Sequence, residues 1–208
     1  MEYLGYLLEH PGSSAARIAA AFSVEHETVR TTISYLRKWL GSDTDGTPYL
    51  PDAYTGGYTL DGRVTSDWNR LQLLIGKGIN TAPTANLRQA LELVRGRPFA
   101  DAADQDWAWD TLRTDIQSAI ADLAHELTIR SLDRNDVRTA RWAAAQGLLV
   151  DPAAELLLAD RVRTEHQAGD TDEVDRLIRR ITSHARQQGT DLLDDTVDIL
   201  QQAVQGRR

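Results

Sequence analysis

Residues 14–60 constrain the fold most, because a short and a longer helical pattern are followed there by a stretch rich in turn residues. We predict a first helix over Ala15 to Ala21, a tight connection over Phe22 to Glu25 and a second helix over His26 to Leu40. This layout is typical of a helix-turn-helix, in which the second helix enters the DNA major groove. Binding of double-stranded DNA is therefore the leading functional hypothesis.

The longer of these helices has two faces. Its apolar residues recur at i, i+4, i+7 and i+11, which predicts one buried stripe: Val29, Ile33, Leu36 and Leu40. Hydroxyl, aromatic and basic side chains on the rest of the helix can contact base edges and phosphates. The candidate DNA-binding residues on it are Thr28, Arg30, Thr31, Ser34, Tyr35, Arg37 and Lys38. The alternative is an ordinary amphipathic surface helix, which also has a polar face.

A β-hairpin is expected after this helix. Two short apolar stretches, Tyr49-Leu50 and Tyr58 to Leu60, bracket the loop Asp52 to Gly57. Such a pair of stretches around a glycine-containing loop predicts a hairpin, and Gly56-Gly57 can supply the positive φ of a turn. Thr55, in the loop, is added to the candidate DNA-binding residues. An ordinary surface hairpin is the alternative.

Several short motifs follow one another along the chain. They are Leu36 to Gly41 (LRKWLG), Thr55 to Leu60 (TGGYTL), Asp67-Trp68, then Leu91, Arg95-Gly96 and Pro98, Asp151-Pro152 with Glu155, and Gly169-Asp170. Taken in this order, they resemble a known family, the actinobacterial antibiotic-regulator activators. The resemblance implies a winged helix-turn-helix followed by a bacterial transcriptional activator domain with a tetratricopeptide-like fold. It covers nearly the whole chain and implies a transcriptional regulator.

The sequence departs from that family at its start. The family usually has a small β-sheet before the first helix of the winged domain, whereas this chain opens at Met1 directly in the helix expected over Glu2 to Glu9. Either the sheet is missing or the chain is the C-terminal part of a longer protein. The same pair of domains also resembles the C-terminal tail of large multidomain actinobacterial proteins.

The second half carries a repeat that does not depend on the resemblance. Asn135-Asp136 and Gly169-Asp170 lie 34 residues apart, and apolar residues recur at the same offset. That period is typical of tetratricopeptide repeats. The predicted fold is therefore mainly α: a winged helix-turn-helix with a short β-hairpin wing over 1–62, and an all-α tetratricopeptide-like domain over 65–205.

Composition excludes several function classes. The chain has no cysteine, which excludes disulfides and thiolate metal sites, and its five histidines are scattered. We therefore expect no metal, no cofactor and no enzymatic activity. With no apolar run of membrane-spanning length and no signal peptide, a cytoplasmic protein without membrane contact is expected. The net charge of −8 opposes DNA binding, because phosphate contacts supply most non-specific affinity.

Trp107 shares no helix face with Trp109, because residues two apart on a helix point in nearly opposite directions. We assign Trp107 to interdomain packing or to a partner site. The functional hypothesis is a DNA-binding transcriptional regulator that reads the major groove with the helix 26–40. Its helical domain would dimerise or contact RNA polymerase or another protein. The alternative is a protein-interaction module that does not bind DNA and forms the C-terminal part of a larger protein.

Overall fold

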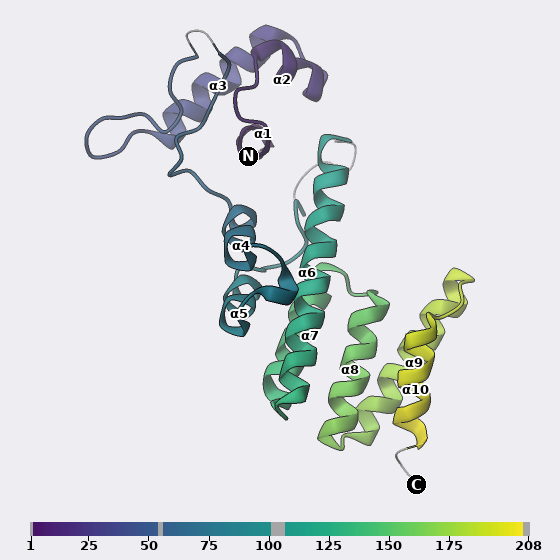
Figure 1. Cartoon of the computed structure of the whole chain (residues 1–208). Helices are drawn as coiled ribbons and strands as arrows, with labels where there is room; N and C mark the ends of the chain where they lie inside the picture. Colours follow the sequence, from purple (N-terminus) through teal and green to yellow (C-terminus); the bar gives the residue numbers. More distant parts are fainter. Residues whose placement is uncertain (1, 54–55, 101–106, 206–208) are drawn as a thin grey trace. The chain divides into compact units, whose positions relative to one another are not determined.

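The computed structural model describes residues 2–53, 56–100 and 107–205, with the side chains of 107–110 left out. The described part of the chain is mainly helical (Figure 1), which confirms the expected fold class at that level. Two compact units are present: unit 1 comprises Met1–Arg70 with Asp101–Leu112, and unit 2 comprises Leu71–Ala100 with Arg113–Arg208. The domain boundaries predicted from the sequence, 1–62 and 65–205, stay a prediction.

Unit 1 begins with three helices, α1 (Glu2–Glu9), α2 (Ala15–Phe22) and α3 (His26–Leu40). The Ser14 hydroxyl accepts a hydrogen bond from the Arg17 amide at 3.2 Å and caps α2. Ser23 ends α2 in the left-handed conformation, so the chain turns tightly into α3. Both α1 and α2 pack against α3.

The core of unit 1 lies between these helices and the chain after α3. Its fully or nearly fully buried side chains include Leu7, Ile18, Val29, Ile33 and Leu50. The Phe22 ring lies at one end of this core. It stacks on the Tyr3 ring, with centroids 4.5 Å apart, and contacts the Tyr6 ring edge-on. The two residues of α3 that are most buried, Val29 and Ile33, belong to the stripe that the sequence predicts.

The predicted β-hairpin is not shown, because the described residues form no strand. Tyr49 and Asp61 are joined by one backbone hydrogen bond of 2.9 Å. Tyr58 instead pairs with the connection between α1 and α2, forming an isolated antiparallel bridge with Ser13. Pro51 cannot donate a hydrogen bond and Tyr58 is already paired with Ser13, so the two stretches do not continue as a ladder.

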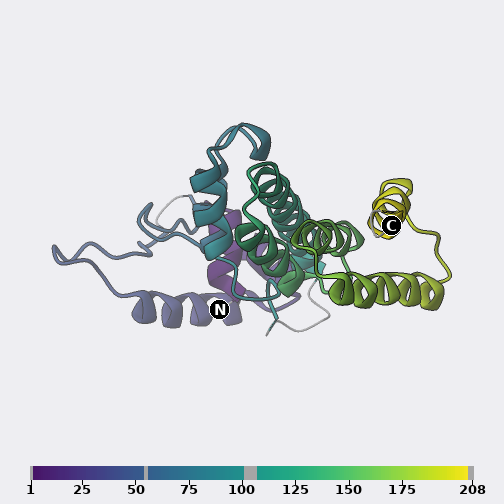
Figure 2. The same ribbon diagram turned by 90° about the horizontal axis from the view of Figure 1, so that it is seen from below.

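Unit 2 is helical throughout its described part. It contains most of α4 (Asp67–Ile75), a short 3-10 turn (Ile79–Thr81), α5 (Thr84–Glu92) and most of α6 (Trp107–Asp133). These are followed by α7 (Val137–Val150), α8 (Glu155–Ala168), α9 (Thr171–Gln188) and α10 (Asp194–Gln205). Helix α8 packs against α7, α9 and α10 (Figure 2). No helix described here is both long and apolar enough to cross a bilayer.

The repeat of 34 residues is reproduced in local geometry. Asn135 and Gly169 both adopt positive φ, at the ends of α6 and α8. The next residue in each case, Asp136 or Asp170, caps the following helix by accepting a hydrogen bond from the amide three positions later. The two helix hairpins α6–α7 and α8–α9 are therefore built by the same turn.

Helices α6, α7 and α8 meet at Gly147. A Cβ added there would lie 2.5 Å from Leu157 Cδ1 and 2.8 Å from Ala124 Cβ. Only glycine allows this approach, because a side chain at that position would overlap two helices at once.

Two buried carboxylates add polar links between the helices of unit 2. Glu165 accepts hydrogen bonds from Arg141 and Arg161, including contacts of 2.9 and 2.8 Å. Burial opposes its ionisation, but the two arginines hold the pKa of Glu165 below its ordinary value. Asp160, which is fully buried, accepts from His125 Nδ1 at 2.8 Å, and burial raises the pKa of Asp160.

Candidate nucleic-acid interface

The exposed side of α3 is the first surface to consider. Six of the residues predicted from the sequence to bind DNA are exposed on this helix, whereas Val29 and Ile33 are buried. Because side chains four apart share a helix face, Arg30, Ser34 and Lys38 form one row. The six exposed residues are Thr28, Arg30, Thr31, Ser34, Tyr35 and Lys38.

Arg37 makes contacts within the protein that the sequence does not reveal, and its predicted role in DNA binding stays a prediction. Its Nε donates to the Leu50 carbonyl at 2.8 Å and its guanidinium also donates to the Pro51 carbonyl at 3.3 Å. The same side chain pairs with Asp52 at 2.9 Å. Arg37 therefore links residues 50–52 to α3, and its guanidinium is paired within the protein.

The other cations of this region differ in whether they form ion pairs within the protein. Arg63 pairs with Asp61 and Asp43 and lies over the Tyr49 ring, 5.2 Å from its centroid. The hydrogen bond from Arg63 lowers the pKa of Asp61 to about 2. Arg30 and Lys38 are exposed and have no ion pair within the described part of the chain. The row on α3 therefore offers two cations for phosphate contact.

A cleft opens beside Arg30. It has a volume of about 360 Å³ and is lined by Arg30, Ile33, Arg37, Asp52, Ala53 and Tyr58. Arg37 and Asp52 pair with each other, so Arg30 is the cation of this lining that remains available. The cleft thus places one available guanidinium between α3 and the segment around Tyr58.

Trp39 is a surface residue that the sequence prediction missed. Its side chain is 66% exposed, and Tyr35, one turn earlier, is 67% exposed. The spacing of four residues puts both rings on one edge of α3. The signal was in the sequence, since Trp39 lies outside the stripe of Val29, Ile33, Leu36 and Leu40. The two rings together form an exposed aromatic surface on α3.

Two predicted residues lie outside what the structure describes. Thr55 is not among the described residues, and the side chain of Trp107 is not described although the residue begins α6. Their predicted roles stay predictions.

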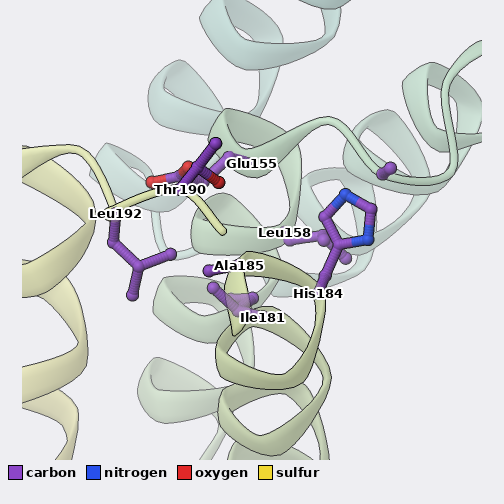
Figure 3. A pocket seen from close by; sticks show the side chains of 8 residues that line it. Glu155, Leu158, Ile181, His184, Ala185, Thr190 and Leu192 are labelled. Atoms are coloured by element: carbon purple, nitrogen blue, oxygen red, sulfur yellow. The ribbon is translucent and has the colours of Figure 1, made fainter. Parts of the chain in front are cut away.

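Metal-ligating side chains and the pocket of unit 2 are the remaining features to consider. The part of the chain that the structure describes contains no group of three or more metal-ligating side chains. His184 and Glu155 line a small pocket in unit 2 (Figure 3), whose volume of about 30 Å³ is of the order of one water molecule. Glu155 accepts a hydrogen bond from the Leu193 amide at 2.8 Å just before α10. This carboxylate therefore supports the start of a helix.

Comparison with family models, with curated proteins and with solved structures found no match.

Proposed function

We propose that the chain is a DNA-binding transcriptional regulator that reads the major groove with α3. In this proposal α2 and α3 of unit 1 form a helix-turn-helix and unit 2 is a tetratricopeptide-like domain, as in the actinobacterial antibiotic-regulator activators. The carrying observation is that α3 is anchored by Val29 and Ile33 and exposes Arg30, Ser34 and Lys38 in one row. A helix held in this way can enter a groove and contact base edges with hydroxyls and phosphates with cations.

The net charge of −8 is compatible with this proposal if DNA contacts the protein only at the exposed row of α3. An acidic body repels DNA outside the contact surface, so that only the row on α3 is attracted to phosphates. The helical domain would hold two copies together or contact RNA polymerase or another protein.

The alternative is an interaction module that does not bind DNA. The observation in its favour is the pair Tyr35 and Trp39, both about two-thirds exposed, because tyrosine and tryptophan are enriched in protein interfaces. Two available cations on α3 are also few for a strong phosphate contact.

Salt-dependent binding of the full chain to labelled duplex DNA decides between the two. Lys38→Ala and Arg30→Ala should each weaken binding and reduce the slope of log K against log salt by about one. Arg179→Ala is the matched control, because Arg179 is an exposed arginine on α9 in unit 2. Absence of any salt-dependent binding by the wild type would favour the interaction module.

A further inference from the structure

A second cleft, in unit 2, has no part in the proposed reading of DNA. It has a volume of about 370 Å³ and is lined by Arg88, Asp136, Arg138, Thr139 and Trp142. Arg88 belongs to α5 and the other residues to α7 or its cap. Because α5 and α7 pack against each other, the cleft is formed between two neighbouring helices.

One wall of the cleft is a stacked pair. The Arg88 guanidinium lies over the Trp142 ring, 5.3 Å from its centroid, within the range of a cation–π contact. Arg88 Nε also donates to Glu92 one turn further on, at 3.2 Å. The guanidinium and the indole together present a surface that is partly apolar and partly cationic.

Besides Arg88, two charged side chains line the cleft, Asp136 and Arg138, and within the described part of the chain only Asp136 is hydrogen-bonded. The Asp136 carboxylate accepts the Thr139 amide at 3.0 Å and caps α7. Its pKa lies below the ordinary value, first because of the Thr139 hydroxyl. The N-terminus of α7 is thus satisfied by its own side chain. Arg138 is exposed and has no ion pair within the described residues.

We propose that this cleft binds an acidic peptide segment of a partner protein. A carboxylate of the segment would pair with Arg138, and an apolar side chain beside it would pack on Trp142. Arginine and tryptophan are the residue types that most often dominate binding energy at protein interfaces. A cationic cleft on a chain of net charge −8 also gives the charge complementarity that selects one site for an acidic partner.

Duplex DNA fits this cleft less well. Its bases are stacked inside the helix and cannot pack against Trp142, so the indole would contribute nothing to the contact. A single extended peptide can place a carboxylate and an apolar side chain next to each other, since successive residues of an extended chain point to opposite sides and alternate ones to the same side.

The test uses the full chain and a short fluorescent peptide of repeated Glu-Ser-Leu-Ser, in which glutamate and leucine are alternate residues and lie on the same side of an extended chain. Its control peptide has glutamine in place of glutamate. Binding is followed by fluorescence anisotropy for the wild type, Arg138→Glu and Arg179→Glu. Arg179 lies exposed on α9, outside the cleft, so its variant makes the same charge change elsewhere in unit 2.

The wild type should bind the glutamate peptide and not the glutamine peptide, and Arg138→Glu should weaken binding by about tenfold or more. Arg179→Glu should bind like the wild type. Trp142→Phe, a milder change, should weaken binding while Arg138 is intact. Equal losses in Arg138→Glu and Arg179→Glu would show a general charge effect and overturn the proposal. So would a wild type that ignores the glutamate peptide, or an Arg138→Glu variant that loses duplex DNA binding to the same extent as peptide binding.

Discussion

Gly57 passes so close to Gly12 that a Cβ on Gly57 would lie 2.2 Å from the Gly12 carbonyl oxygen. The approach is fixed on both sides by backbone hydrogen bonds of 2.9 and 2.8 Å between Tyr58 and residues 12 and 13. Gly57 also has a φ of +89°, in the region that favours glycine. This crossing joins the segment after α3 to the connection between α1 and α2.

Gly57→Ala should therefore lower the free energy of unfolding by at least about 2 kcal/mol, because both backbone strain and overlap with rigid backbone oppose it. Chemical denaturation followed by circular dichroism measures the loss. Gly56→Ala is the control, since a Cβ there meets nothing within 4 Å. Equal effects of the two changes would contradict the close approach.

Arg37→Ala should lower the free energy of unfolding by about 1–2 kcal/mol, because three contacts to the chain at residues 50–52 are lost. Lys38→Ala, next to it and exposed, should change stability by less than about 0.5 kcal/mol. Denaturation of both variants, beside their DNA binding, separates a structural role from contact with DNA. A stable Arg37→Ala chain that loses DNA affinity would restore the role predicted from the sequence.

Glu165→Gln should cost about 1–3 kcal/mol of stability at neutral pH, because the buried carboxylate that pairs with Arg141 and Arg161 loses its negative charge and leaves the partly buried Arg161 without its closest partner. Glu92→Gln is the exposed counterpart. It breaks an ion pair with Arg88 whose side chains are both about half exposed, so its cost should stay below about 1 kcal/mol. Thermal or chemical unfolding of the two variants gives the comparison, and similar losses would show that burial of Glu165 does not matter.

The His125–Asp160 pair should make stability depend on pH. The hydrogen bond that His125 donates to the Asp160 carboxylate raises the pKa of His125 in the folded protein. A group whose pKa is raised by folding stabilises the protein fully below its unfolded pKa, about 6.5 for histidine. That stabilisation is lost as the pH rises through the folded pKa. The wild type should therefore lose more stability than His125→Gln when the pH rises above about 6.5. Parallel curves for the two proteins over this range would contradict the coupling.

Helices could be predicted because burial leaves a periodic pattern in the sequence. The stripe from Val29 to Leu40 predicts α3 with the bounds that the structure has. The repeat at Asn135 and Gly169 likewise marks two real turns. The hairpin could not be predicted correctly, because two short apolar stretches do not reveal which segment of the chain each of them will pair with. Tyr58 pairs with Ser13, which is far away in the sequence.

The exposed face of α3 was predictable and the roles on it were not. Periodicity places Arg30 and Arg37 on the same flank of the helix, but Arg37 is bound to three acceptors that follow the helix in the chain. These contacts depend on the path of the chain that brings residues 50–52 back against α3, and helix periodicity does not predict that path. Trp39 was missed although its place outside the apolar stripe is visible in the sequence, whereas the extent of its exposure, 66%, depends on the packing around α3.

The core of unit 1 has a consequence for synthesis on the ribosome. Its most buried side chains run from Leu7 to Leu50, and the bridge between Ser13 and Tyr58 closes the same segment. These contacts can form as soon as the first 60 residues have left the ribosome, because segments of a chain fold in the order in which they are made. The packing of α8 on α10, in contrast, joins residues that are among the last to be made. The face that carries Arg30 and Lys38 can therefore be in place while the end of unit 2 is still being synthesised.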